Sequence, residues 1–385
     1  MAAEPHTKEP VVENTITWVG LDAHKSFINV AVLNSTSGPL LEWRTEHTRT
    51  KAKRLARKLE KLADGAEVRV CYEAGPCGWA LKRLLEEAAP LVCEVVAPSL
   101  IPVKPGDRVK TDRKDARKLA EYHRAGLLTE VAPPTEQQEA VRDLVRQRDA
   151  AKTDLGRARH RLSKFLIRRH ISCNAKNWTQ KHMQWLAKLK LEDPTDQVVF
   201  RDLYEQVVHQ TQRKEQLTRA LNEVATHEPY CEPVGWLRCF RGIDTVTAMT
   251  IVAELFDFSR FSSAPKLMGY LGLTPSEYTS GDPRRGSITK AGNGRVRSIL
   301  IEAAQHSKKS FRIGRELRVR RAHQPTEVVA LADRAMRRLH VVYWRLTHKG
   351  KHHNVAVTAC AREFVGFIWA LMHPAGVGAM ASRSS

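Results

Sequence analysis

Between residues 16 and 125 the apolar residues alternate between the spacing of strands and that of helices, which restricts the folds open to the chain. Strands are predicted at residues 16–22, 27–33, 41–47, 67–73 and 92–97. Helices are predicted at residues 51–62, 78–88 and 113–125. Three strands followed by helix, strand, helix, strand and helix predict an α/β domain in which helices flank a mixed central sheet.

This order of elements is that of a ribonuclease-H-like, or resolvase-like, fold. We expect the fold over residues 15–131, after a disordered N-terminus at residues 1–14. The sequence Ala-Pro-Pro-Thr at residues 132–135 then breaks the pattern and is typical of a linker into a helix.

Residues 136–230 are predicted to form a central helical hairpin or coiled coil. Between residues 144 and 165, mostly apolar residues recur in alternating steps of three and four positions, which is the spacing of a heptad seam. One arginine interrupts this seam, which consists of Leu144, Arg148, Ala151, Leu155, Ala158, Leu162 and Phe165. The seam predicts that one helix packs along another.

A mainly α C-terminal domain is expected at residues 235–373, followed by a flexible tail at 374–385. Residues 242–255 are similar to a helix-hairpin-helix element, whose backbone amides would face phosphate, although Asp244 replaces the usual second glycine. Residues 273–293 form a basic stretch rich in Gly, Ser, Thr and Pro, which is predicted to be a functional loop.

The charge of the chain predicts a polyanionic partner. Lys and Arg number 63 against 42 Asp and Glu, which gives a formal net charge of +21. The longest apolar candidate, residues 364–372, is shorter than the roughly 18 residues that span a bilayer. We therefore expect no membrane association and a cytoplasmic protein, associated with the bacterial nucleoid during its reaction. Seven scattered cysteines without a Cys-x-x-Cys pair predict neither a zinc knuckle nor disulfides.

Four acids are candidates for a metal-dependent phosphoryl-transfer site. Asp22 ends the first predicted strand, Glu73 ends the fourth, and Asp112 and Asp115 share a face at the start of the last helix of the α/β domain. Two-metal chemistry on phosphate needs several carboxylates that converge on hard cations. Each acid alone has a plainer interpretation as a turn residue, a helix cap or a partner of a nearby cation.

Basic residues near these acids and elsewhere are predicted to contact nucleic-acid phosphates. The α/β domain contributes a first group around the paired aspartates, the central helix a second, and the C-terminal loop a third. These residues are Lys110, Arg113, Lys114, Arg117, Arg157, Arg161, Arg168, Arg284, Arg285 and Lys290. The plainer interpretation of the helical group is a solvated face.

Two sets of motifs resemble the DEDD transposases, the insertion-sequence family numbered one hundred and ten. The first set contains Val-Gly-Leu-Asp at 19–22, Tyr-Glu-Ala-Gly at 72–75 and Lys-Thr-Asp-Arg-Lys-Asp at 110–115. The second contains Gly-Tyr-Leu-Gly-Leu-Thr-Pro at 269–275 and Lys-Ala-Gly-Asn at 290–293. The resemblance covers most of the chain.

The resemblance implies a transposase or recombinase that cuts and rejoins DNA strands of an insertion sequence. It implies that Asp22, Glu73, Asp112 and Asp115 bind Mg²⁺ and that a serine, here Ser280, attacks the scissile phosphate and forms a covalent phosphoserine intermediate. Members of the family are similar to recombinases guided by a noncoding bridge RNA, which act on donor and target DNA as tetramers, or dimers of dimers.

The residues themselves support Ser280 more weakly. An exposed hydroxyl beside Gly281 in a basic loop has the access that a nucleophile needs, and nearby arginines can stabilise negative charge on phosphate. We prefer Ser280 to Ser276 and Ser287, and its plainer role is that of a turn serine. Within the loop, no histidine or lysine other than Lys290 is a candidate general base for it.

Two other functions are compatible with the same residues. A hydrolytic nuclease for Holliday junctions would use the four acids to activate water and would need no serine. A non-catalytic nucleic-acid-binding or packaging protein would use only the basic helices, and its acids would be structural.

Overall fold

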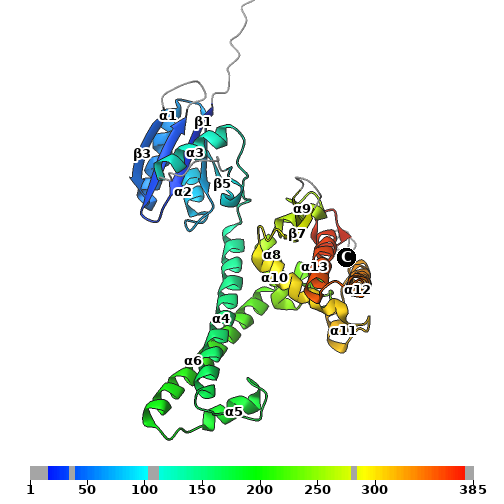
Figure 1. The fold of residues 1–385 in the computed structure, drawn as a ribbon. Coiled ribbons are helices and arrows are strands. Elements are labelled where there is room, and N and C mark those ends of the chain that lie inside the picture. Colours follow the sequence, from blue (N-terminus) through cyan, green and yellow to red (C-terminus); the bar gives the residue numbers. More distant parts are fainter. Residues whose placement is uncertain (1–15, 34–39, 103–111, 279–283, 378–385) are drawn as a thin grey trace, which may run out of the picture. The chain divides into compact units, whose positions relative to one another are not determined.

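The computed structural model describes residues 16–33, 40–102, 112–278 and 284–377. The chain divides into two compact units, residues 1–133 and residues 134–385 (Figure 1). Each unit is described by itself below.

A five-stranded mixed sheet forms the centre of the N-terminal unit. Its strands are β1 (Ile16–Ala23), β2 (Phe27–Leu33), β3 (Leu41–Glu46), β4 (Glu67–Glu73) and β5 (Val92–Val96). They lie in the order β3-β2-β1-β4-β5. The pairs β1–β2 and β2–β3 are antiparallel, whereas β1–β4 and β4–β5 are parallel. The α/β sheet predicted from the alternation is confirmed.

Helices cover both faces of this sheet. α1 (Arg49–Ala63) and α2 (Ala80–Ala88) pack on one face, where Val19 and Leu21 of β1 join the buried cluster that includes Leu59 and Leu85. α3 (Asp112–Arg124) packs on the other face, over β1, β2 and β4. A short 3₁₀ helix, η1 (Pro98–Leu100), follows β5.

Two long helices pack along each other at the start of the C-terminal unit (Figure 1). They are α4 (Glu136–Ile167) and α6 (Pro194–Val224), with α5 (Gln180–Lys188) between them in the chain. The predicted seam side chains from Ala151 to Phe165 are buried, and Leu144 is partly buried. Arg148, which interrupts the seam, donates from its Nε to Thr218 Oγ1 of α6 at 3.3 Å. A capping box made by Thr135 and Gln138 starts α4, which explains where the linker ends.

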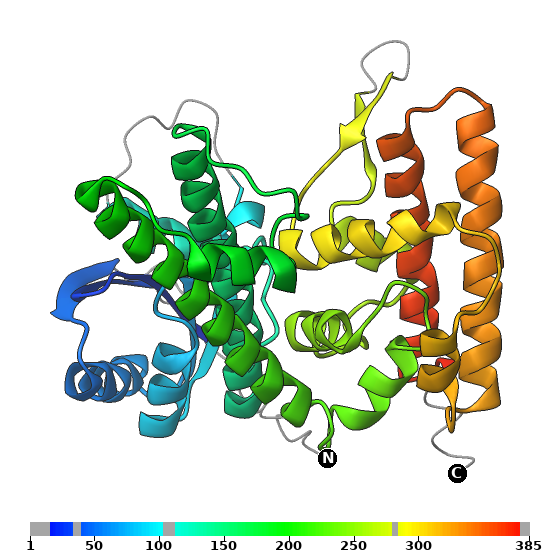
Figure 2. The same cartoon turned by 90° about the horizontal axis from the view of Figure 1, so that it is seen from below.

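The rest of this unit is a helical assembly with one hairpin. Its elements are α7 (Cys231–Leu237), α8 (Thr245–Leu255), α9 (Ala264–Tyr270), β6 (Pro275–Tyr278), β7 (Arg284–Ile288), α10 (Gly294–Ala304), η2 (Gln305–Lys308), α11 (Arg315–Arg321), α12 (Thr326–His348) and α13 (His353–Met372). α12 and α13 lie side by side (Figure 2). α7, α9, α11, α12 and the hairpin had no counterpart among the predicted elements.

The C-terminal apolar segment is longer than the sequence pattern indicated. α13 has 20 residues and, by length and composition alone, is long and apolar enough to cross a membrane. Eight of its side chains are nevertheless buried within the unit, including Phe364, Val365 and Ile368, which join one large core cluster. α13 is therefore a core helix of the C-terminal unit.

Candidate active site on the sheet and hairpin

The two predicted strand-end acids, Asp22 and Glu73, lie on neighbouring strands at equivalent positions. β1 pairs with β4 in parallel, and the last matched residues are Leu21 and Tyr72. Asp22 and Glu73 each follow that pair directly. Equivalent residues of adjacent parallel strands have side chains on the same face, and the strands are about 4.8 Å apart. The two acids therefore share one face of the sheet.

That face is the one covered by α3. A Cβ atom added to Gly20 would lie 2.1 Å from a backbone oxygen of α3, so β1 approaches the helix backbone directly. On β4, the Cys71 thiol donates to the Leu119 carbonyl of α3 at 3.6 Å. Side chains alternate along a strand, so Asp22 and Glu73, two residues further on, face the same side.

The direction of α3 brings its N-terminus toward these acids. The ring of Trp18 contacts that of His123, near the helix C-terminus, with centroids 4.8 Å apart. Gly20, two residues further along β1, lies against the middle of the helix. Asp22, two residues after Gly20 on β1, is therefore directed toward the first turn of α3, which contains Asp112 and Asp115. The side chain of Asp112 lies outside the described residues.

Two neighbours hold the Asp22 carboxylate. Asn29 lies opposite Asp22 across β1 and β2, and its Nδ2 donates to Asp22 Oδ2 at 3.2 Å. His24 Nε2 lies 3.0 Å from the same oxygen. His47 stabilises the turn that contains His24, because its Nδ1 donates to the His24 carbonyl oxygen at 2.6 Å. The sequence reasoning missed Asn29, although an amide in the apolar stretch 27–33 was the available signal.

The donor set suits a hard divalent cation. Asp22, Glu73, Asp112 and Asp115 supply only carboxylate oxygens, which Mg²⁺ prefers. Among the side chains that the structure describes, no group of three or more His, Cys, Asp or Glu is arranged to hold an ion. The four acids fit the ion by ligand type, and the register of β1 and β4 places two of them, Asp22 and Glu73, on one face of the sheet.

Cations lie beside this edge. Lys114 and Arg117 are exposed on α3, and Arg117 Nε lies 3.4 Å from Glu121 Oε1. The predicted phosphate contacts Lys110 and Arg113 fall outside the residues whose side chains are described. The exposed pair can attract a phosphate backbone toward the acids.

The predicted basic loop of the C-terminal unit is in part a β-hairpin, which corrects the expectation of an irregular loop over residues 273–293. β6 and β7 pair antiparallel, with Tyr278 opposite Arg284. Ser280, the predicted nucleophile, comes between the two strands in the sequence and is outside the described residues, as are the side chains of Arg284 and Arg285. The alternation of this segment was hidden by its many Gly, Ser and Pro residues.

Of the two alternative serines, Ser276 has a structural role. Ser276 Oγ donates to the Ser287 carbonyl across the hairpin at 3.0 Å. Gly286 makes room for this contact, since a Cβ there would lie 2.4 Å from the Ser276 hydroxyl oxygen. Ser276 is thus engaged in holding the strands together.

Two motif segments meet at the base of the hairpin. Gly272 has a φ of +61°, and a Cβ on it would lie 2.4 Å from the backbone nitrogen of Ala291. Gly292 has a φ of +60°, and its Cβ would lie 1.9 Å from the Tyr270 carbonyl oxygen. Lys290 is exposed, and its backbone amide donates to the Gly272 carbonyl at 3.1 Å. Glycine is needed at both positions because the backbones touch and the conformation is left-handed.

A buried carboxylate ties this base to α4, α8 and α10. Glu254 of α8 accepts from Arg146 Nε at 2.8 Å and from Arg146 Nη2 at 2.9 Å. It also accepts from Asn293 Nδ2 at 2.9 Å, and Arg295 lies 3.4 Å away. Burial raises the pKa of Glu254, but the Arg146 hydrogen bonds and charge and the Asn293 bond outweigh it, so the pKa is lowered. In the sequence, the position of Glu254 within the apolar run 249–255 indicates a buried carboxylate that needs cationic or amide partners.

The predicted phosphate contacts of the central helix lie on its surface. Arg157 is 70% exposed, with Asp154 3.5 Å away. Arg161 is exposed and its Nη2 donates to Gln206 of α6 at 2.8 Å, while Arg168 is exposed at the end of α4. These side chains are accessible to a polyanion without any rearrangement of α4 and α6.

The turn before α8 differs from a phosphate-binding hairpin at Asp244. Its Oδ1 accepts from the Thr247 amide at 2.8 Å, so the side chain caps the helix. A carboxylate at this helix end repels phosphate and uses an amide that a phosphate would otherwise bind. This residue explains the departure from the glycine pattern.

Comparisons with known proteins agree with the motifs. One family profile, described as transposase of the IS116/IS110/IS902 family, matches residues 236–318. A second, the transposase profile DEDD_Tnp_IS110, matches residues 19–171. The chain is 26% identical to the transposase for insertion sequence element IS1328 of Yersinia enterocolitica, over 63% of this chain and 72% of that protein.

Two relatives are similar over most of their length. The chain is 38% identical to putative transposase y4qE of Sinorhizobium fredii, over 93% of this chain and 89% of that protein. It is 36% identical to the transposase for insertion sequence element IS1533 of Leptospira borgpetersenii, over 87% of this chain and 97% of that protein. The chain therefore belongs to the IS110 family of transposases, enzymes that cut and rejoin DNA to move an insertion sequence.

Proposed function

We propose that the N-terminal unit carries a Mg²⁺-dependent DNA-cleavage site made by Asp22, Glu73, Asp112 and Asp115. The observation that carries this proposal is the register of β1 and β4, which aligns Asp22 with Glu73 on the face covered by α3. The sheet order β3-β2-β1-β4-β5, with α3 on that face, supports a ribonuclease-H-like fold for this unit.

The four carboxylates would hold the ion, which when bound neutralises charge on the scissile phosphate and on the leaving oxygen. The rest of the site acts through this chain's own groups. Asn29 and His24 fix the orientation of the Asp22 carboxylate. Lys114 and Arg117 attract the phosphate backbone to the edge of the sheet.

Ser280 is proposed as the nucleophile. Its Oγ attacks phosphorus, an O–P bond to serine forms, and the bond from phosphorus to one deoxyribose oxygen breaks, so that strand end leaves as a hydroxyl. Attack on the phosphoserine by a hydroxyl of another strand reverses these changes and rejoins the DNA. Energy of the phosphodiester is conserved, so no nucleotide cofactor is required. The base of the hairpin supports this role because it is firmly tied to three helices.

The test compares covalent capture with hydrolysis. The full chain, co-expressed with the noncoding RNA that flanks its own element, is incubated with labelled donor and target DNA and Mg²⁺ and run on denaturing gels. We expect a DNA-linked protein band that disappears in Ser280→Ala and Asp22→Asn. Ser276→Ala is the matched control and should keep the band, because that hydroxyl only joins the two strands of the hairpin.

Hydrolysis is the alternative function. A nuclease that activates water with the same four acids would leave free nicked DNA in equal yield from wild type and Ser280→Ala. That result would overturn the serine mechanism and keep the carboxylate site. Loss of all cleavage in Ser280→Ala but not in Asp22→Asn would overturn the carboxylate site.

The RNA partner, the tetramer and the cytoplasmic location are part of the same proposal. A basic chain with exposed arginines such as Arg157 and Arg161 along α4 has phosphate-binding surface beyond the cleavage site. Copurification of RNA tests the RNA partner, and sedimentation of the complex tests the tetramer. A protein that recombines DNA although it sediments as a monomer and carries no RNA would contradict both.

A further inference from the structure

Three aromatic rings form a strip on the outer surface of the C-terminal unit. The ring of Phe311 lies 4.7 Å from that of His340 on α12, and His340 lies 6.2 Å from Trp344, one turn further along the helix. Phe311 is 45% exposed and Trp344 is 41% exposed. Large aromatic side chains are normally turned inward, so an exposed row of them indicates a binding surface.

The rings of this aromatic strip are held in place. His340 Nδ1 lies 3.0 Å from the Ser307 carbonyl, which can only accept, so Nδ1 carries the proton. Trp344 packs edge-to-face on Tyr343, with centroids 5.3 Å apart, and the Tyr343 hydroxyl lies 2.8 Å from His353 Nδ1. A ligand would meet rings already ordered, which lowers the entropy cost of binding.

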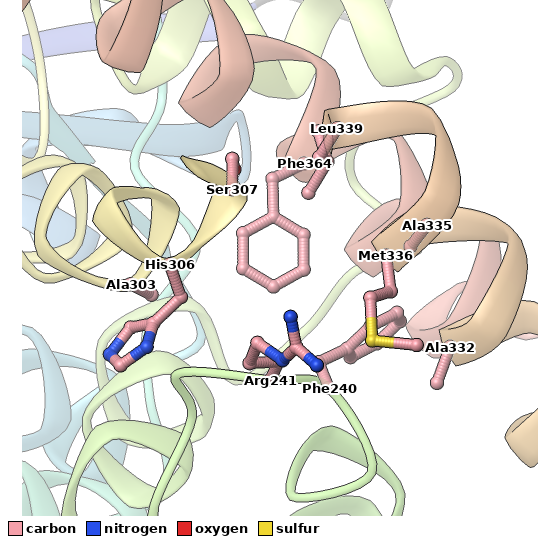
Figure 3. Close-up of a pocket in the computed structure, with 10 residues that line it drawn as sticks. All are labelled: Phe240, Arg241, Ala303, His306, Ser307, Ala332, Ala335, Met336, Leu339 and Phe364. Atoms are coloured by element: carbon pink, nitrogen blue, oxygen red, sulfur yellow. The ribbon is translucent and has the colours of Figure 1, made fainter. Parts of the chain in front are cut away.

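The core-facing side of α12 offers no room for a ligand at this level. The cavity between α12, η2 and α13 measures about 20 Å³, the size of a single water. Figure 3 shows that Phe240, Phe364 and Met336 close around it. A ligand of this region therefore has to contact the outer face.

The surroundings of the strip are strongly cationic. Residues 305–321 and 337–353 contain twelve Lys and Arg and one acid, Glu316. Some of these cations are neutralised, since Arg321 pairs with Asp333 and Arg338 with Glu363. Nine others are exposed along the same two segments: Lys308, Lys309, Arg312, Arg315, Arg318, Arg337, Arg345, Lys349 and Lys351.

We propose that Phe311, His340 and Trp344 form a stacking surface for single-stranded DNA. Exposed rings in a positively charged surface are what unpaired bases and their phosphates require together. A duplex offers no free base faces, so it would use the cations and not the rings. Aromatic residues and Arg also occur at protein–protein interfaces, but Lys is depleted there, whereas Lys308, Lys309 and Lys349 are exposed in the same two segments as these rings. DNA is the polyanion that the reaction of this family supplies, and strand exchange exposes single strands.

The experiment measures binding of labelled oligo(dT) and of a duplex of equal length to the full chain by fluorescence anisotropy, without divalent ions. Phe311→Ala and Trp344→Ala are each expected to raise the Kd for oligo(dT) by about 5- to 100-fold and to leave the Kd for duplex nearly unchanged. Trp344→Phe should retain most of the affinity because it keeps a ring. Val341→Ala is the control, since Val341 is 52% exposed on the same helix but has no ring.

Three outcomes would overturn the proposal. In the first, the Kd for oligo(dT) is unchanged in both alanine variants. In the second, the affinities for single-stranded and duplex DNA fall equally, which makes the surface electrostatic only. In the third, the variants change the sedimentation of the protein and not its DNA binding, which makes the strip an interface between proteins. If oligo(rU) alone is bound in a ring-dependent way, the ligand is RNA and the assignment to DNA is wrong. Because no cleavage is measured, failure of the carboxylate or serine mechanism leaves this test unaffected.

Discussion

Asn29 shows how a single buried amide can set the behaviour of a candidate metal ligand. It is 8% exposed in the centre of the sheet and donates to one oxygen of Asp22. A carboxylate held at one oxygen presents the other in a fixed direction. Such outer contacts orient metal ligands, and their loss typically weakens metal binding.

Asn29→Ala is expected to lower the apparent Mg²⁺ affinity in DNA cleavage by about 10- to 100-fold, with activity recovered at high Mg²⁺. The measurement is the Mg²⁺ dependence of the cleavage rate. Thr45→Ala, one strand away in β3, serves as the control. A loss of rate that no Mg²⁺ concentration restores would mean that Asn29 has a different role.

Glu254 is a second residue whose environment makes a definite prediction. Its side chain is 2% exposed and bonds to Arg146 and Asn293. Glu254→Ala removes a buried charge partner and is expected to lower the free energy of unfolding by about 3 kcal/mol, the lower part of the range for buried pairs, because Arg146 is 46% exposed and regains water. Urea unfolding followed by circular dichroism measures this change.

The same residue predicts a dependence on pH. The folded-state pKa of Glu254 is lowered from its ordinary value of 4.5, so the carboxylate contributes stability above that value. The contribution is lost as the pH falls through the folded pKa. Wild type should therefore lose stability below about pH 4.5 more steeply than Glu254→Gln. Parallel curves for the two proteins would show that another carboxylate controls acid unfolding.

At the scale of elements, the contact between β1 and α3 determines whether the four acids can meet. A Cβ at Gly20 would lie 2.1 Å from the Ala116 carbonyl oxygen and 2.5 Å from the Ala120 amide nitrogen. Both are backbone atoms, so a side chain there cannot be accommodated by rotation. α3 would have to move away from the sheet.

Gly20→Ala should therefore lower the stability of the N-terminal unit by about 1–3 kcal/mol and reduce metal-dependent cleavage, because α3 carries Asp112 and Asp115. Thermal unfolding and the cleavage assay measure the two effects. Gly156→Ala is the matched control: nothing lies within 4 Å of its added Cβ, and in the exposed surface of α4 it should stabilise by about 0.5–1 kcal/mol. Equal behaviour of the two variants would contradict the close approach.

The elements that sequence could predict are those with strong periodicity. The strands of the first unit alternate or are continuously apolar, and this pattern predicts Asp22 and Glu73 at strand ends; β4 ends at Glu73, and β1 ends one residue after Asp22. The hairpin β6–β7 was missed because its Gly and Pro residues are typical of a loop. The contacts of Asn29 and Glu254 depend on register and packing, which no local pattern contains.

For the whole molecule, charge governs how strongly DNA is bound. The net charge of +21 is distributed over both units, with exposed cations on α3, α4 and α11. If the complex uses six or more phosphate contacts, the affinity for duplex DNA should fall about 10³-fold or more between 50 and 200 mM salt. Anisotropy titrations over a salt series measure the slope. A weak dependence on salt would show that binding is dominated by uncharged contacts.

The ties at the base of the hairpin have a mechanical consequence. Gly272 and Gly292 press two chain segments together, and Asn293 links them through Glu254 to α4 and α8. The base is thus a stiff bracket and not a hinge, so a load applied to β6 or β7 is transmitted to the long helix instead of being absorbed locally. We therefore expect DNA that binds at β6 and β7 to be held at a fixed position relative to α4 and α8 while its strands are exchanged.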